Sequence, residues 1–393
     1  CDMNLHEHQA KALLRSYGIP MTDGVNVETP AEAALAADNL GGAAWAVKAQ
    51  IHAGLRQKAG GVRLVHCSEE VRKAAAELLG SRLVTAQTGP DGKTVKSVYI
   101  ERAVDFDRAV YLAALVDRTA GRVGFIAARD GGDDIEDLVA GDPSRLLRLI
   151  VDPDQGIERE AALALAKRLG LGDVQARQAL EIMAATYKAF FDLDASLIEF
   201  NPLVVATDGD LLALDAKIVL DDNALFRHQD LEALRDEDEV DPSELDAKRF
   251  ELNYVKLSGN IGVMVNGAGL ALSTIDLLKE QGGEPADFMD IRSEATREQI
   301  AGGFGLLLRN PKVEAILVNI YGGGILRCDT VAEGIGTACR EATLTVPLIV
   351  RAAGTNGDLA RKILMAQGIP VEFADTVGEA VVKAVRAAQA GAR

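Results

Sequence analysis

Three oxygen-bearing side chains stand close together in an otherwise apolar stretch, residues 197–217, and their types and spacing suit a divalent cation. Two apolar runs flank the turn sequence Thr-Asp-Gly-Asp at 207–210, which predicts a β-hairpin. Glu199 and Asn201 are two residues apart and share one face of the first strand, and Asp215 lies on the returning strand. Oxygen ligands of this kind suit Mg²⁺, with substrate phosphates completing the set. The alternative is a hairpin that exposes its polar face to water.

A second candidate site lies earlier in the chain and consists of cations. Lys48 is in the middle of a short predicted strand, residues 45–50, where a buried lysine needs an anionic partner such as a phosphate. An edge strand whose lysine reaches water explains the same pattern. The sequence HAGLRQKAGG at 52–61 mixes small residues with Arg56 and Lys58, as a segment that covers an anionic ligand would. Its spacing is not that of a P-loop.

The elements that must position these residues form two regions. The first mixes helices and strands, and an acidic stretch between residues 230 and 251 ends it, which marks a domain boundary. The helix at 29–41 has the clearest start, with Thr29 as N-cap and a proline in the first turn. The other expected elements are helices at 5–17, 68–79 (capped by Ser68), 159–169 and 174–191, and strands at 45–50, 95–101, 111–117 and 122–128.

The second region is a regular alternation of strands and helices. This alternation predicts a doubly wound parallel sheet, which binds ligands beyond the carboxyl ends of its strands. Turns that begin at residues 266, 290 and 321 follow three of these strands and are rich in glycine or polar residues. The expected strands are 260–266, 287–291, 315–320, 347–351 and 370–373, with helices near 270–280, 297–308, 330–341, 359–366 and 377–388.

Composition narrows the class of protein. The chain has 393 residues, 48% of them hydrophobic, and the alternating patterns indicate an α/β protein. A net charge of −17 argues against non-specific binding to nucleic acid or anionic membranes. Four scattered cysteines and five histidines lack the spacing of a disulfide framework or a zinc site. No apolar run reaches membrane-spanning length and no signal peptide precedes Met3, so we expect a cytoplasmic protein.

Several segments, in order along the whole chain, form a family pattern: NLHEHQAKALL, VKAQIHAG with KAGG, IEFNPL, LDAK, DDNALFR, GVMVNGAGLAL, GGEPADFMD and LVNIYGG with RCD. They resemble the β subunits of succinyl-CoA synthetase (succinate–CoA ligase, ADP-forming), a family of the tricarboxylic acid cycle, and relatives such as malate–CoA ligase. The resemblance implies an α/β chain with an N-terminal ATP-grasp domain at 1–238. A flavodoxin-like, doubly wound parallel-sheet domain, the CoA-ligase domain, is implied at 239–393.

The resemblance also implies a reaction and a partner. The partner is an α subunit that carries the phosphorylated histidine and most of the CoA site, in an αβ or α2β2 assembly. Mg²⁺ is the cofactor, and ATP or GTP is a substrate. The nucleotide phosphorylates the histidine, the phosphohistidine phosphorylates a short acid, and the CoA thiolate displaces phosphate to give an acyl-CoA. Positioning and charge neutralisation do most of this catalytic work.

Roles for single residues follow from the same resemblance. Glu199 would face the partner's histidine and orient or stabilise its phosphorylated form, and Asn201 and Asp215 would hold Mg²⁺. The residues expected at the nucleotide are Lys48, Leu55, Arg56, Gln57, Glu101 and Val104. The residues expected at the acid are Asn266, Arg292 and the loop residues Gly323, Gly324, Ile325 and Leu326.

On the nucleotide side, the chain departs from the family pattern at three positions. Leu55 and Gln57 replace two glycines, and Ala109 stands where the family commonly has glutamate. These changes raise the alternative of a non-catalytic regulatory or scaffolding subunit whose nucleotide site has eroded. Against erosion, the chain keeps the lysine, the amide and the carboxylates of both candidate sites, which are costly to bury without a partner.

On the acid side, Arg-Ser-Glu-Ala at 292–295 replaces a glycine-rich turn, and the loop at 322–324 has one glycine more than is usual. Arg292 could offer a bidentate site to an additional anionic or hydroxylated group. We therefore hypothesise that the substrate is malate or another substituted short-chain acid, not plain succinate. The alternative is that Arg292 pairs with Glu294 and that the loop only bulges.

Overall fold

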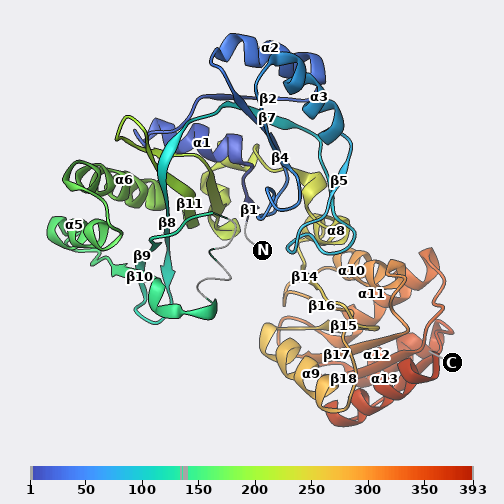
Figure 1. Cartoon of the computed structure of the whole chain (residues 1–393). Helices are drawn as coiled ribbons and strands as arrows, with labels where there is room; N and C mark the ends of the chain where they lie inside the picture. Colours follow the sequence, from blue (N-terminus) through green and yellow to red (C-terminus); the bar gives the residue numbers. More distant parts are fainter. Residues whose placement is uncertain (1–2, 133–134, 136–139, 392–393) are drawn as a thin grey trace. The chain divides into compact units, whose positions relative to one another are not determined.

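The computed structural model describes residues 3–132, 135 and 140–391, and internal contacts divide the chain into two compact units (Figure 1). The first unit spans Cys1–Glu239 and the second spans Val240–Arg393, so the division lies next to the boundary expected after residue 238. Each unit has hydrophobic cores of its own. Within the described ranges, no helix is long and apolar enough to cross a membrane.

A seven-stranded antiparallel sheet is the larger sheet of the first unit, with strand order β1-β13-β11-β8-β9-β10 and β12 beside β11. The predicted hairpin is confirmed, because β11 (Ala195–Ala206) pairs with β12 (Leu211–Ala213) and β13 (Ala216–Leu220). The other edge of β11 pairs with β8, so the hairpin lies inside the sheet and is not a solvated ribbon. The remaining strands are β1 (Met3–Asn4), β8 (Phe106–Asp117), β9 (Arg122–Ala128) and β10 (Leu147–Ile150).

Three helices contribute to the core of this sheet. They are α1 (Glu7–Ser16), α5 (Arg159–Arg168) and α6 (Asp173–Asp192), each within two residues of its expected ends. Phe125 and Phe200 are fully buried at the centre, and burial of each such side chain contributes about 1.5–3 kcal/mol. The apolar face of α1 therefore fixes the position of its neighbouring polar residues over the sheet.

A four-stranded sheet, with order β2-β7-β3-β4, carries the second candidate site. β3 (Trp45–Ala49) lies between β7 (Val98–Arg102) and β4 (Val62–Val65). Lys48 is therefore in an interior strand and only 7% exposed, so the alternative of an edge-strand lysine in water is wrong. The remaining strands of this part are β2 (Gly24–Val27) and the separate pair β5 (Arg82–Leu83) and β6 (Lys93–Thr94).

Two helices pack their alanine-rich faces against this sheet, α2 (Pro30–Leu40) and α3 (Ser68–Leu78) (Figure 1). The predicted start of α2 is confirmed, since Thr29 accepts a hydrogen bond from the Glu32 amide in a capping box. The expected cap of α3 is wrong. Ser68 is the first helical residue, and Cys67 holds the cap position without a side-chain hydrogen bond.

The acidic stretch before the second unit is attached to the first unit by ion pairs. Asp236 lies 2.9 Å from Nε2 of His6, Asp238 pairs with Lys96, and Glu239 lies 3.3 Å from Nζ of Lys93. Residues 236–239, the last of the first unit, are thus held by ion pairs to other residues of that unit. The short helices of this part of the chain are α7 (Gln229–Glu232), η3 (Glu237–Glu239) and, in the second unit, α8 (Pro242–Arg249), and two further short helices are η1 (Pro143–Arg145) and η2 (Asp222–Arg227).

The second unit contains the expected parallel sheet and one strand that the sequence did not reveal. Five strands are parallel. Numbered in the order of the chain, they lie in the sheet as 2-1-3-4-5, which is typical of flavodoxin-like folds, and an antiparallel sixth strand lies at one edge. The sheet order is β14 (Asn253–Lys256), β16 (Asp287–Asp290), β15 (Ile261–Val265), β17 (Ala315–Gly322), β18 (Leu348–Gly354) and β19 (Val371–Phe373).

Helices cover both faces of this sheet, so the expected double winding is confirmed. Separate hydrophobic clusters on the two faces bury residues of the helices (Figure 1). One cluster contains residues of α10 (Arg297–Arg309), α11 (Cys328–Glu341) and α12 (Gly357–Ala366). The other contains residues of α9 (Ala268–Glu280) and α13 (Val377–Gly391).

Candidate nucleotide and acid sites

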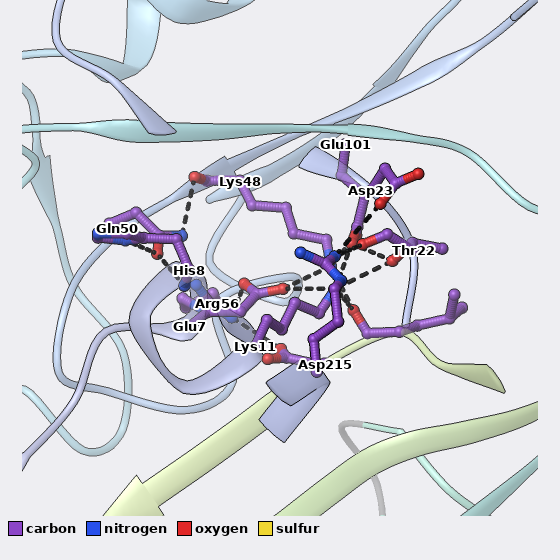
Figure 2. A network of polar contacts seen from close by, with 12 residues as sticks. Glu7, His8, Lys11, Thr22, Asp23, Lys48, Gln50, Arg56, Glu101 and Asp215 are labelled. Atoms are coloured by element: carbon purple, nitrogen blue, oxygen red, sulfur yellow. Dashed lines mark hydrogen bonds and ion pairs between the residues drawn. The ribbon is translucent and has the colours of Figure 1, made fainter. Parts of the chain in front are cut away.

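Six charged side chains from distant parts of the first unit meet in a largely buried group, called the charged cluster below (Figure 2). Three are cations and three are carboxylates, so the formal charges balance. The six side chains come from α1, β3, β7, the segment 52–61 and the link before β13. The members are Lys11, Lys48 and Arg56, and Glu7, Glu101 and Asp215.

Lys48 has carboxylate partners instead of the water that an edge position would give it. Its Nζ lies 2.8 Å from Oε1 of Glu7 and 2.6 Å from Oε2 of Glu101. The same ammonium donates to the Leu214 carbonyl oxygen at 2.8 Å. Burial lowers the pKa of Lys48, but the Glu101 and Glu7 carboxylates outweigh burial and raise that pKa above its usual value. The ammonium is therefore held charged inside the protein.

Arg56 connects the segment 52–61 with both α1 and the hairpin. Its Nη2 lies 2.7 Å from Oε2 of Glu7 and 2.7 Å from Oδ2 of Asp215. Its Nη1 donates to the Ala49 carbonyl oxygen at 2.8 Å. Glu7 thus uses one oxygen for Lys48 and the other for Arg56. Burial raises the pKa of Glu7, but the charges of Lys48, Arg56 and Lys11 prevail and hold that pKa well below its usual range.

Sequence reasoning missed two members of the cluster, Glu7 and Lys11. Lys11 is fully buried, pairs with Glu101, and donates to Thr22 Oγ1 at 3.0 Å and to the Leu214 carbonyl oxygen at 2.7 Å. Burial, reinforced by the nearby Lys48 charge, lowers the pKa of Lys11. The signal was present, because positions 7, 10, 11 and 14 form the buried face of α1 and two of them are charged.

The two residues expected to hold Mg²⁺ lie opposite each other. The register that pairs Phe200 with Ala216 and Leu203 with Ala213 puts Asn201 across from Asp215. Oδ1 of Asn201 accepts a hydrogen bond from the Gly132 amide at 2.6 Å, and Asp215 accepts from Arg56.

An amide oxygen and a carboxylate fit Mg²⁺ when phosphates supply further ligands. Across the described residues, no group of three His, Cys, Asp or Glu side chains could hold a metal by itself. Among the residues described here, Asn201 and Asp215 therefore offer part of a ligand set, which phosphates would extend.

The remaining expected residues differ in their burial: Glu199 is the one expected at the partner's histidine, and Leu55, Gln57 and Val104 are expected at the nucleotide. Glu199 on β11 is half-buried and opposite Lys217, and Val104 is half-buried in the turn between β7 and β8. Gln57 is exposed, whereas Leu55 is half-buried. Leu55 has a φ of 59°, in the left-handed region that favours glycine, so its substitution for glycine leaves a strained backbone here.

In the second unit, the three expected turns follow adjacent parallel strands at one edge of the sheet. Asn266, after β15, donates to the Tyr321 carbonyl oxygen at 2.9 Å and accepts from the Tyr321 amide at 2.8 Å. Its amide therefore ties the ends of β15 and β17 together. In the loop before α11, Gly323, Gly324 and Ile325 are exposed, and Leu326 is buried.

Arg292 lies just beyond β16 at the same edge and is exposed. Among the residues that the structure describes, Arg292 makes no ion pair with Glu294, so the alternative in which these two pair is not seen. Its guanidinium is available to a ligand at this edge.

Comparisons with known proteins identify the two domains. A family model described as ATP-grasp domain matches residues 4–205, and one described as CoA-ligase matches residues 264–388. The chain thus has the domain pair of acid–thiol ligases that use a nucleotide.

Full-length relatives make the assignment more specific. The succinate–CoA ligase [ADP-forming] subunit beta of Parvibaculum lavamentivorans is 49% identical over 390 residues, covering 99% of this chain and 100% of the relative. The protein of the same name from Paramagnetospirillum magneticum is 48% identical over 399 residues, with 99% and 100% coverage. The chain belongs to the family of succinate–CoA ligase β subunits.

A solved structure supports the fold over the whole length. The ATP citrate lyase from Methanothrix soehngenii, in complex with citrate and coenzyme A, aligns with a TM-score of 0.71 at 18% identity. The alignment covers 98% of this chain and 100% of that one.

Proposed function

We propose that the chain is the β subunit of a nucleotide-dependent ligase that joins a short dicarboxylic or substituted acid to CoA, together with an α subunit that bears the phosphorylated histidine. The observation that carries this proposal is the charged cluster, in which two buried cations, Lys48 and Arg56, lie beside the opposed pair Asn201 and Asp215. An anionic phosphate group is the natural ligand of such an arrangement.

In this proposal, Lys48 and Arg56 neutralise the phosphate charge, and Glu101, with Leu55, Gln57 and Val104, lines the nucleotide pocket. When Mg²⁺ is bound, it neutralises further phosphate charge, and Asn201 and Asp215 hold it. Glu199 orients the partner's histidine while that histidine receives and gives up the phosphoryl group. These residues bind and orient; the nucleophiles of all three steps come from the α subunit, the acid and CoA.

On the acid side, Asn266 and the loop residues Gly323, Gly324, Ile325 and Leu326 receive a carboxylate. Asn266 gives the site its rigidity, because its hydrogen bonds to Tyr321 fix the start of the loop. We propose Arg292 as the contact to an additional polar or anionic group of the acid, which favours malate or a similarly substituted acid over succinate.

The test is a thioester assay on this chain, co-expressed with an α subunit, with succinate, malate and other substituted short acids, each with ATP and GTP. We expect continuous release of nucleoside diphosphate, beyond the first one per active site, to depend on acid and CoA. Arg292→Ala should reduce the malate-to-succinate ratio of kcat/KM about tenfold, as expected for loss of a charged contact. Arg297→Ala is the matched control, because Arg297 is exposed and pairs with its helix neighbour Glu298.

An unchanged ratio in Arg292→Ala would remove Arg292 from the acid site. No turnover with any acid, combined with no Mg²⁺-dependent nucleotide binding, would favour the scaffolding subunit instead. We also propose a cytoplasmic location and an αβ or α2β2 assembly with the α subunit. Light scattering on the purified complex measures the stoichiometry of that assembly.

A further inference from the structure

Glu7 has no role in the residue assignments above, yet it contacts both cations that we propose for the phosphates. Its two carboxylate oxygens are divided between Lys48 and Arg56 at 2.8 and 2.7 Å, and the side chain is buried (Figure 2). Its third cation, Lys11, is farther away at 3.6 Å. One carboxylate therefore serves as the counter-ion of both cations.

We propose that Glu7 is a positioning residue that makes nucleotide binding depend on Mg²⁺, by serving as the internal counter-ion of Lys48 and Arg56. This inference rests on the proposed nucleotide function of the site. When nucleotide binds without metal, the Glu7 carboxylate already neutralises Lys48 and Arg56. The phosphates must therefore compete with that carboxylate for the two cations. Mg²⁺ brought in with the nucleotide adds the positive charge that the cluster lacks.

The hairpin residues support this reading. Oδ2 of Asp215 accepts from Arg56, and Oδ1 of Asn201 accepts from the Gly132 amide. A cation bound to the Asp215 carboxylate competes with Arg56 for its charge and so weakens one of the two ion pairs that hold Arg56. The ion pair with Glu7 remains, so Arg56 becomes available to a phosphate without leaving its position.

Glu7 is better suited to this role than the neighbouring Glu101. Glu101 pairs with Lys11 and accepts from Thr22 in addition to its contact with Lys48, so part of its charge is used away from the proposed phosphate cations. Both oxygens of Glu7 lie on those cations. Loss of the Glu7 charge should therefore directly change the net charge around Lys48 and Arg56.

The experiment is calorimetric titration of the full chain with ADP, once with Mg²⁺ and once with EDTA. Glu7→Gln keeps the shape of the side chain and removes its charge. We expect metal-free ADP to bind about tenfold more tightly to this variant, the change of one charged contact, and Mg²⁺–ADP affinity to change much less. Glu69→Gln, in an exposed pair with Arg72, is the control and should leave the ratio of the two affinities unchanged.

The conservative variant Glu7→Asp should keep most of the preference for Mg²⁺–ADP, which a role in packing alone does not predict. If Glu7→Gln weakens both forms by the same factor, or leaves their ratio unchanged, the counter-ion role is overturned. If the unaltered chain binds neither form, the proposed function fails instead.

A measurement on the unaltered chain covers the case in which Glu7→Gln does not fold. With ADP present, saturating Mg²⁺ should speed backbone hydrogen exchange in the segment 52–61 relative to ADP with EDTA, because the ion pair of Arg56 with Asp215 weakens. Unchanged exchange in that segment would contradict the exchange of partners on which the inference depends.

Discussion

Replacement of Lys11 by methionine tests whether the charged cluster holds the first unit together. Lys11 is fully buried, and its ammonium serves Glu101, Thr22 and the Leu214 carbonyl oxygen. Methionine has a similar length, so the variant removes a charge and leaves little cavity. We expect the free energy of unfolding of the first unit to fall by about 3 kcal/mol.

The magnitude follows from the partners that remain. Removal of one member of a buried ion pair usually costs about 3–5 kcal/mol, because the other charge stays buried without compensation. Here Glu101 still has Lys48 at 2.6 Å, so the lower end of that range applies. Thr22 and the Leu214 carbonyl oxygen lose a donor in addition, which keeps the effect above that of a surface substitution.

The structure supplies the probe for this measurement. Trp45 is the single tryptophan of the chain and is buried in β3 of the first unit, so its fluorescence during urea unfolding follows that unit. Lys188→Met is the matched control, since Lys188 is exposed and pairs with Asp192 one helical turn away. The control should stay within about 0.5 kcal/mol of the unaltered chain. A loss below 1 kcal/mol for Lys11→Met would show that the charge of Lys11 does not stabilise the first unit.

Two further predictions concern the second unit. Burial raises the pKa of Asp287 to about 6, so between about pH 4 and pH 6 the folded unit binds more protons than the unfolded chain. The free energy of unfolding of this unit should therefore fall by about 3 kcal/mol as the pH rises through this window. Calorimetry should show this dependence on pH in the unaltered chain and not in Asp287→Asn. Gly354→Ala should lower the melting temperature of this unit, because Gly354 has a φ of 87° and an added Cβ would lie 2.2 Å from the Gly322 carbonyl oxygen. Gly368→Ala, with a φ of 70° and free space around it, should cost only the backbone term of about 1–2 kcal/mol, and equal losses for both would contradict the predicted clash.

Elements with strong local signals could be predicted from the sequence. The start of α2 is specified within one turn by Thr29, Pro30 and Glu32, and the structure has that capping box. Alternation of apolar strands and helices gave the parallel sheet of the second unit. β14 was missed because it has only four residues, of which Asn253 and Lys256 are exposed. Its pairing with β16 comes from the fold and not from its own composition.

The candidate site could be predicted only in part, because its contacts join residues far apart in the chain. The sequence indicated that Lys48 needs an anion, but Glu7 and Glu101 come from other elements: Glu101 is brought to it by the pairing of β7 with β3, and Glu7 by the helix α1. The position of β3 inside its sheet depends on β4 and β7 in the same way. Lys11 shares the buried face of α1 with Ala10, Leu14 and the charged Glu7, and two charges on a face with that spacing are a local signal that would have identified it.

The proposed ligase function is tested most directly by the steady-state rate of ADP formation. The rate is measured on the chain assembled with an α subunit, in the presence of ATP, Mg²⁺, CoA and an acid substrate. We expect steady-state ADP formation in step with the acyl-CoA, sustained only when acid and CoA are both present, and no more than one ADP per active site, from phosphorylation of the histidine, when they are absent. Lys48→Met should reduce this rate about a hundredfold, the usual effect of removing one group that stabilises developing charge. An equal rate in Lys48→Met would contradict the proposed role of the charged cluster, and continued ADP formation without acid, beyond one ADP per active site, would contradict the proposed reaction.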